Sequence, residues 1–187
     1  MKQMSTRKRL WFYRVLTLTA TAAIVHLVTV WAAPRLIMRV LMDGPMAHAL
    51  NMQNQEAFPS PVNAASRSVV MPSPDMLYSV CVYDVSAGPV QIKANPGLQT
   101  YWSVALYSAN SDNFFVLNDR KAAGKPVDLW LVSERGNPDG RVVPEGVQVV
   151  VSPSTKGFLL MRVLTGNYEA EKSVLEPARR TLVCNKV

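Results

Sequence analysis

The first part of the chain is dominated by one long uncharged stretch. Residues 15–33 are 19 residues without a charge, and aromatic side chains stand near its two ends, at positions 11–13 and at Trp31. Because a helix rises about 1.5 Å per residue, this stretch nearly matches a hydrocarbon core about 30 Å thick. Aromatic rings favour the headgroup level on either side. The pattern predicts one transmembrane helix over residues 15–33.

The charges on the two sides of this stretch are unequal. Five basic residues precede it, whereas only Arg35 and Arg39 follow closely, and residues 1–39 contain no acidic residue. Basic residues are retained on the cytoplasmic side of a membrane. We therefore expect a cytoplasmic basic tail over residues 1–14 and export of everything that follows the span.

A cleaved signal peptide is the alternative interpretation of the same residues. Signal peptides have an apolar stretch of about 7 to 15 residues and a small residue before the cut. Here the stretch is longer, the bulky Trp31 stands where a small residue is wanted, and Pro34 follows the most natural cleavage point. These features favour a retained anchor.

One face of the predicted span carries small and polar residues. A charged His26 is costly to bury in a membrane, so a proton relay and a neutral hydrogen bond to a second helix are alternative roles. The helical spacing of its neighbours favours the hydrogen bond and therefore a partner helix. The contact face consists of Thr19, Ala22, Ala23, His26 and Thr29.

Residues 34–66 are expected to connect the span to the folded domain. Residues 34–50 have the spacing of a short amphipathic helix with a break at Asp-Gly-Pro, and residues 51–66, which lack apolar periodicity, indicate a linker. Three methionines recur every four residues and are either thioether metal ligands or packing residues; the helical spacing favours packing. They are Met38, Met42 and Met46.

From Arg67 onward, helical spacing gives way to short runs rich in Val, Leu, Tyr, Phe and Trp, divided by Pro, Gly, Asn and Asp. Trp102, Val104 and Leu106 alternate with residues that point the other way, as in a strand with one buried face. Turn signals between the runs favour antiparallel neighbours. Residues 67–187 are thus expected to form an all-β domain, a sandwich or jelly roll of about eight strands. The predicted strands are residues 67–71, 77–85, 89–94, 100–107, 113–118, 127–133, 147–152 and 157–164.

A short C-terminal helix is expected after the last predicted strand. Asn167 is a suitable N-cap, acidic residues follow at positions 169 and 171, and Arg179 and Arg180 come later, which is the charge order that a helix dipole favours. Pro177 removes one backbone donor, so it either kinks this helix or starts a second turn.

The net charge of +7 comes from the N-terminal part of the chain. Seven basic residues lie within residues 1–39, and the rest of the chain holds 13 basic and 13 acidic side chains. A formally neutral domain offers no electrostatic attraction to a phosphate backbone, so no nucleic-acid partner is expected.

The two cysteines both lie on the exported side, Cys81 in a predicted strand and Cys184 near the C-terminus. A disulfide and two separate buried thiols are the alternatives, and an oxidising compartment favours the disulfide. Closing a loop of about 100 residues contributes up to about 4.7 kcal/mol in the chain-entropy model. The lack of a CxxC motif argues against redox catalysis.

The predicted β-domain lacks the residues of common catalytic sites. The two histidines, His26 and His48, precede it, and no nucleophile elbow, P-loop or dinucleotide motif occurs. Triads, Cys-His pairs and His-based zinc sites all need an imidazole. We therefore expect no catalytic residue, no metal and no cofactor.

Five stretches of the exported part carry a recognisable pattern: PSPDMLYS at 72–79, DVSAGPV at 84–90, YWSV at 101–104, DNFFVLNDR at 112–120, and ARR at 178–180 continuing to Cys184. They resemble the bacterial domain-of-unknown-function 1254 family, and are similar to its short membrane-anchored members from proteobacteria. Asp75 and Tyr78 match the opening motif of that family, whereas Ser73 and Met76 replace its usual Asn and Thr. The resemblance implies a β-sandwich-like fold, a bacterial inner membrane and a periplasmic C-terminal domain, and it names no reaction.

Larger members of that family often carry a second domain, of unknown function 1214, and a separate protein is expected to supply it here. The leading hypothesis is accordingly a non-enzymatic envelope interaction or assembly component, with the lipid bilayer and another membrane or periplasmic protein as partners. The alternative is a domain that binds or hydrolyses a glycan or lipid, because paired carboxylates can act as acid and base. For Asp75 itself, the simpler role is that of a turn residue bonded to nearby amides. The candidate binding residues are Asp75, Tyr78, Asp112 and Asn113.

Overall fold

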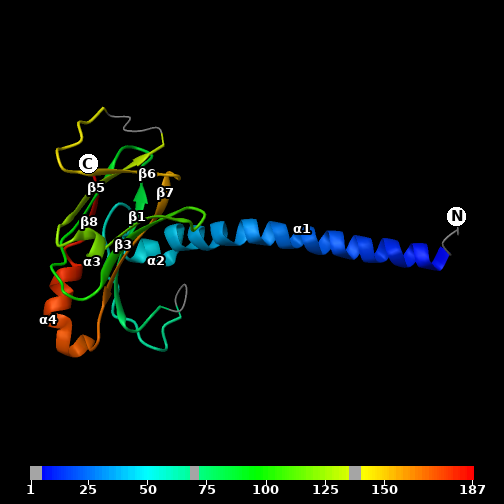
Figure 1. Cartoon of the computed structure of the whole chain (residues 1–187), viewed down its shortest axis with the longest axis horizontal. Helices are drawn as coiled ribbons and strands as arrows, with labels where there is room; N and C mark the ends of the chain where they lie inside the picture. Colours follow the sequence, from blue (N-terminus) through cyan, green and yellow to red (C-terminus); the bar gives the residue numbers. More distant parts are fainter. Residues whose placement is uncertain (1–5, 68–71, 135–139) are drawn as a thin grey trace. The chain divides into compact units, whose positions relative to one another are not determined.

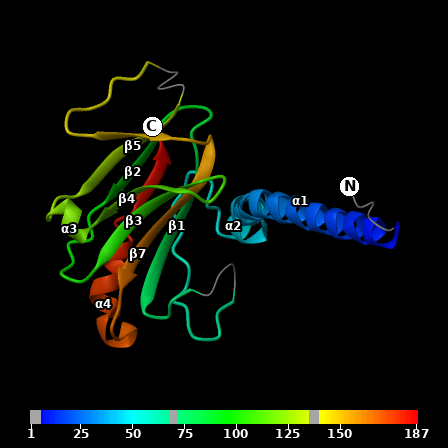
Figure 2. The same ribbon diagram turned by 45° about the vertical axis from the view of Figure 1, so that its right-hand side comes forward.

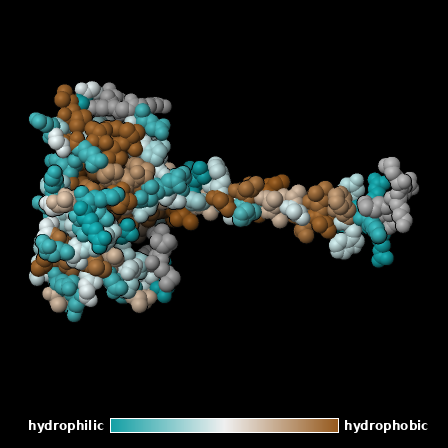
Figure 3. Space-filling model, viewed as in Figure 1, coloured by the Kyte–Doolittle hydropathy of each residue, from teal (hydrophilic) through white to brown (hydrophobic). Residues whose placement is uncertain are grey.

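The structure, a computed structural model, describes residues 6–67, 72–134 and 140–187, and it divides the chain into two compact units, Met1–Ile37 and Met38–Val187. The described residues of the first unit belong to helix α1 (Thr6–Asp43), which is the blue ribbon of Figure 1. Hydrophobic residues cover much of this helix in Figure 3, and its large apolar side chains, from Leu10 to Trp31, are exposed. The segment Thr6–Ala49 is long and apolar enough to cross a membrane. The helix predicted over residues 15–33 is thus present, as part of a longer one.

Eight strands and three shorter helices make up the described part of the second unit (Figures 1 and 2). Seven strands match predicted ones; the predicted strand 67–71 lies, apart from Arg67, outside the described residues. Strand β8 and helix α3 were not predicted. The elements are α2 Pro45–Ala49, β1 Met76–Asp84, β2 Val90–Ala94, β3 Trp102–Ser108, β4 Asn113–Asn118, α3 Asp119–Ala122, β5 Val127–Ser133, β6 Gln148–Ser152, β7 Lys156–Leu164, α4 Tyr168–Arg179 and β8 Val183–Lys186.

The strands form two sheets, a first sheet in the order β1-β7-β3-β4 and a second in the order β6-β5-β2-β8. The paired strands run antiparallel, as predicted, except β5 and β6, which are parallel. The expectation of wholly antiparallel connectivity was therefore wrong for this pair. A parallel pair needs a crossover of about a dozen residues or more, and the 14 residues between Ser133 and Gln148 are long enough to supply it.

One apolar core lies between the two sheets. Alternate residues of β1, such as Leu77 and Tyr83, pack in the same cluster as alternate residues of β5, such as Leu129 and Leu131. Cys81 of β1 and Cys184 of β8 form a disulfide across this core, with both side chains fully buried. The predicted disulfide is confirmed, and it joins the first sheet to the second.

A second apolar cluster covers the outer face of the first sheet. Met38, Met42 and Met52 pack there with Val80, Val82 and Phe158, and Met46 lies against the cluster. The methionine spacing thus reflects packing, as predicted.

The residues just after α2 also hydrogen-bond to β1. Ala57 and Val80 exchange two backbone hydrogen bonds of 2.8 and 2.9 Å, and the amide of Val82 donates to the carbonyl oxygen of Met52 at 2.8 Å. The compact unit therefore begins at Met38 and includes part of the segment expected to be a linker before Arg67. These contacts could not be predicted from hydrophobic periodicity, because isolated bridges leave no apolar period.

Helix α4 confirms the predicted C-terminal helix. The side chain of Asn167 caps it by accepting a hydrogen bond from the amide of Ala170 at 3.3 Å, and Pro177 lies inside the helix, which continues to Arg179. In Figure 2, α4 lies beside the end of β7 and the start of β1. This placement brings α4 to one end of the two sheets, where the candidate site is found.

Candidate functional site

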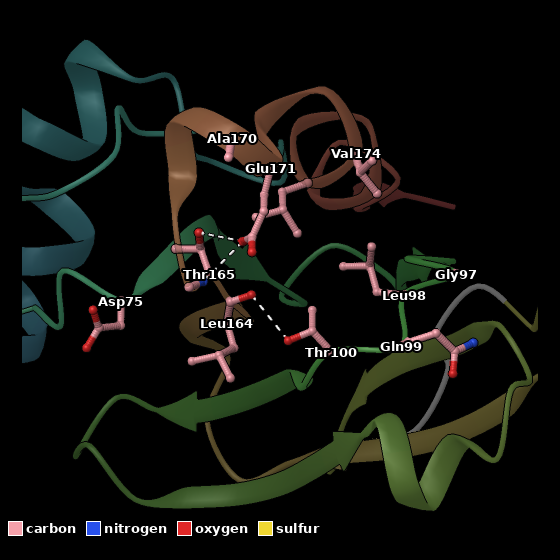
Figure 4. Close-up of a pocket in the computed structure, with 12 residues that line it drawn as sticks. Asp75, Gly97, Leu98, Gln99, Thr100, Leu164, Thr165, Ala170, Glu171 and Val174 are labelled. Atoms are coloured by element: carbon pink, nitrogen blue, oxygen red, sulfur yellow. Dashed lines mark hydrogen bonds between the residues drawn. The ribbon is translucent and has the colours of Figure 1, made fainter.

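An open groove of about 820 Å³ lies at the end of the sheets beside α4 (Figure 4). Three segments far apart in the sequence form it: the connection between β2 and β3, the end of β7 with the turn after it, and one side of α4. Asp75, just before β1, completes the lining. The lining residues are Asp75, Gly97, Leu98, Gln99, Thr100, Leu164, Thr165, Gly166, Ala170, Glu171, Val174 and Leu175.

The lining is more apolar than polar. Leu164 at the end of β7 is 37 % exposed and Val174 on α4 is 60 % exposed, so hydrophobic side chains face solvent here. A backbone hydrogen bond joins the end of β7 to the connection before β3: the amide of Leu164 donates to the carbonyl oxygen of Tyr101 at 2.9 Å. An apolar surface on a fixed backbone frame is suited to binding apolar groups.

The charged groups of the groove are both acidic. One oxygen of Glu171 accepts hydrogen bonds from the Thr165 hydroxyl and the Gly166 amide, each at 3.1 Å, and these bonds hold the turn after β7 (dashed lines in Figure 4). The Asp75 carboxylate is exposed and makes no hydrogen bond with the described residues, although the Asp75 carbonyl accepts from the amide of Thr165. Among the described residues, no basic side chain lines the groove.

The four residues predicted as a binding site do not come together. Asp75 lines the groove, but the Tyr78 hydroxyl is engaged with the backbone of Ser73, accepting from its amide at 2.9 Å. Asp112 and Asn113 lie in and after the turn between β3 and β4, where Asp112 accepts from the Asn110 side chain at 2.6 Å and Asn113 donates to the Leu106 carbonyl oxygen at 3.4 Å.

The strand register shows how far apart the two pairs of residues lie. Both β1 and β3 pair antiparallel with β7, so the start of β1 and the end of β3 lie at opposite ends of the first sheet. Met76 is paired with Leu164 and Ser108 with Gly157. Gly157 and Leu164 are seven positions apart, which is about 23 Å along a strand and too far for one small-molecule site.

Charge pairing fixes the C-terminal end of α4. Arg179 is buried and pairs with Glu176 at 2.7 Å, and Glu176 also accepts from Tyr168 at 3.1 Å and Arg180 at 3.3 Å. Burial alone raises the pKa of Glu176, but the hydrogen bond and charge of Arg179, with the bonds from Tyr168 and Arg180, outweigh it and hold the pKa below its ordinary value. The helix that forms one wall of the groove is therefore firmly anchored.

The structure also bears on the expectations for metal ions and for the contact face of α1. No group of three or more His, Cys, Asp or Glu side chains in that part of the chain could hold a metal ion. On α1, the residues of the predicted contact face are exposed, and the Thr19 hydroxyl donates to the Val15 carbonyl oxygen of its own helix at 2.9 Å. A role of this face in contact with a second helix stays a prediction.

The sequence indicated few of the groove residues. Asp75 was singled out, but Leu164, Thr165 and Val174 carry no chemical signature. Glu171 was assigned only to the helix dipole. Nothing in the linear pattern shows that the β2–β3 connection meets the turn before α4.

Comparison with known proteins places the chain by fold. The model of a family described as "Protein of unknown function (DUF1254)" matches residues 51–184. No curated protein matches. The solved structure of the VPA0106 protein from Vibrio parahaemolyticus is similar, with a TM-score of 0.66 and 16% identity, over 84% of this chain and 36% of that one. A putative uncharacterized protein from Burkholderia cenocepacia, at a TM-score of 0.43 and 13% identity, is matched over 63% of this chain and 33% of its own. The chain thus spans about a third of the length of these solved proteins.

Proposed function

Because the chain belongs to the DUF1254 family of proteins of unknown function, we propose a role that needs no reaction: a membrane-anchored, non-enzymatic envelope protein whose groove docks a segment of another protein. The anchor would be α1, which crosses the bacterial inner membrane with its N-terminus in the cytoplasm. The second unit would be a β-sandwich in the periplasm, where a disulfide persists.

The observation that carries the proposal is the exposed apolar lining of the groove beside two carboxylates. Val174 and Leu164 present hydrophobic surface to solvent, and a partner that covers them gains free energy from burying that surface. Asp75 and Glu171 place negative charge at the same groove, and no described residue that lines it carries a positive side chain. The complementary occupant is therefore a peptide segment with apolar side chains and at least one Lys or Arg.

The length comparison supports a second protein as the source of that segment. The solved Vibrio protein matches 84% of this chain with only 36% of its own length, so a fold like this one occurs there as part of a chain more than twice as long as this one. We propose that the fold described here meets its companion in trans. A separate protein with a DUF1214-like domain is the first candidate partner.

Site-specific photo-crosslinking in living cells tests the groove. We expect a photoreactive amino acid at Val174, which is 60 % exposed in the groove, to yield one discrete crosslinked protein product. The matched control is Val142, which is 87 % exposed and does not line the groove. Equal products from both positions, or none from Val174, would contradict docking in the groove.

The substitution Asp75→Lys, made in the protein that carries the photoreactive residue at position 174, tests the charge of the occupant. Asp75 is exposed and bonded to the described residues only through its backbone, so the fold should tolerate the change. The crosslink yield should fall several-fold if the segment is basic. A crosslink to lipid or glycan in place of protein would favour the alternative, a domain that binds or hydrolyses such a ligand.

A further inference from the structure

Two buried hydrogen-bond donors lie side by side, without acceptors, on the outer face of the first sheet. Arg162 of β7 is paired with Ser103 of β3, and both alternate with residues of the core between the sheets, so both face outward. The Nε atom of Arg162 and the Oγ atom of Ser103 are buried and have no hydrogen-bond partner within the described residues. The Ser103 side chain is fully buried.

The residues that pair with Arg162, and those that flank it on the outer face of β7, carry no negative charge. Its other cross-strand partner is Tyr78, whose hydroxyl is engaged with the backbone of Ser73, and the next outward-facing residues along β7 are Leu160 and Leu164. Arg162 takes part in no ion pair with the described residues. A guanidinium that is partly removed from water without a counter-ion is unfavourable, so the missing group is an anion that accepts hydrogen bonds.

Asn118 extends the row of donors. It is paired with Ser103 on the side opposite Arg162, in strand β4. Its side-chain oxygen is already engaged, because it accepts from the amide of Lys121 at 2.9 Å and so caps α3. The amide nitrogen of Asn118 therefore keeps donors for another group. Three donors, from Arg162, Ser103 and Asn118, lie in one row across neighbouring strands.

We propose that Arg162, Ser103 and Asn118 form a binding site for a phosphate group. A guanidinium pairs with two oxygens of a carboxylate or a phosphate in a fork. A carboxylate has no oxygen beyond those two, whereas a tetrahedral phosphate has further oxygens for the Ser103 hydroxyl and the Asn118 amide. The site is separate from the groove and does not depend on the function proposed for it.

Thermal unfolding of the full-length protein in a non-ionic detergent tests the site with inorganic phosphate as probe. At about ten times the dissociation constant, phosphate should raise the Tm by about 3 to 5 °C relative to chloride at equal ionic strength. The Arg162→Gln variant should lose this site-specific rise. Arg120→Gln is the matched control, because it removes the same charge at an exposed position of α3 and should keep the rise. Phosphate also stabilises proteins without binding a specific site, by being excluded from their surface. This non-specific rise in Tm should be the same in the wild type and the two variants, so a difference between them reports binding at the site.

Two further variants keep the test valid if Arg162→Gln folds poorly. Arg162→Lys keeps the positive charge but loses the fork, so the rise should fall to less than half. Ser103→Ala removes one donor and leaves the charge, so it should weaken the response in part. A phosphate response that is the same in the wild type and in every Arg162 and Ser103 variant would overturn the proposal.

Native mass spectrometry separates the two sources of phosphate, a lipid headgroup and the free ion. The detergent-solubilised full chain is mixed with phosphatidylglycerol, and the bound lipid that survives into the gas phase is measured for the wild type, Arg162→Gln and Arg120→Gln. Lipid retention that depends on Arg162 identifies a headgroup as the ligand. A phosphate-dependent Tm without such retention identifies the free ion, and the loss of both effects overturns the site.

Discussion

Arg179 of α4 donates a hydrogen bond from Nη1 to the backbone carbonyl oxygen of Tyr78 in β1, at 2.8 Å. The same nitrogen reaches the carbonyl oxygen of Pro59 at 2.9 Å, and Nη2 pairs with Glu176. One buried cation thereby joins α4, the edge of the first sheet and the segment that precedes β1. Since α4 forms a wall of the groove, this contact also sets the position of that wall.

Replacing Arg179 with Met should lower the free energy of unfolding by about 3 to 5 kcal/mol, because it leaves Glu176 and two backbone carbonyls without their buried partner. Urea unfolding monitored by circular dichroism measures the change. Arg180→Gln is the control: its side chain is 56 % exposed, so the loss should stay within about 1 kcal/mol. Similar losses in the two variants would show that Arg179 does not hold α4.

The stability contributed by Glu176 should depend on pH in a defined direction. Its pKa is lower in the folded protein than its ordinary value of 4.5, so the folded state favours the charged form. The contribution is therefore complete above the ordinary value and is lost as the pH falls below it, through the folded-state pKa. We expect the difference in urea midpoint between wild type and Glu176→Gln to be largest near neutral pH and to shrink in acid. A difference that is constant down to pH 3 would contradict this linkage.

Removal of the Cys81–Cys184 disulfide should lower stability by up to about 4.7 kcal/mol in the chain-entropy model for a loop of about 100 residues. Guanidinium unfolding of the Cys81→Ala, Cys184→Ala double variant measures the loss. The control is each single variant, which breaks the same bond and should be destabilised to a similar extent. A double variant as stable as the wild type would mean that the bond adds nothing to the fold.

Truncation should reveal that the domain begins before Arg67. A chain that starts at Met38 keeps the residues that cover Val80, Val82 and Phe158, whereas a chain that starts at Arg67 exposes them. We expect the shorter chain to aggregate or to melt well below the longer one, measured by light scattering and circular dichroism. The substitution Met52→Ala in the longer chain should alone cost about 2 to 5 kcal/mol, since the Met52 side chain is fully buried. Equal stability of the two truncated chains would show that this cover is dispensable.

Reporter fusions test the proposed topology. Alkaline phosphatase, which is active only outside the cytoplasm, should be active when fused after Val187 and inactive when fused at the N-terminus. Exchanging the basic residues of positions 1–14 for neutral ones should reduce this asymmetry, because those charges retain the N-terminus in the cytoplasm. Activity of the N-terminal fusion would contradict the orientation.

Local patterns predicted local features of this protein well. The alternation of Trp102, Val104 and Leu106 placed β3 with the correct residues inward, although Ser103 and Ala105 on the other face are fully buried too. The disulfide followed from compartment and an even cysteine count, and α4 from its N-cap and charge order. These signals lie within a few residues of each other or depend on chemistry alone.

Features that depend on distant partners were missed. Strand β8 spans only Val183–Lys186, directly after a helix, and it is stabilised by pairing with β2 and by the Glu56 carboxylate, which accepts from the amide of Cys184 at 3.0 Å. Arg179 was assigned to the helix dipole, because the carbonyl oxygens that it binds belong to residues more than 100 positions earlier. The same distance in sequence concealed the groove and the pairing of Arg162 with Ser103.

The covalent bond between Cys81 and Cys184 turns most of the second unit into a closed ring, since the two cysteines are 103 positions apart. The residues before Cys81, which include α1, form a tail joined to this ring. A protease that cuts the ring once leaves both pieces joined to each other and to that tail. Release of any part of the ring therefore requires either a second cut or a reductant.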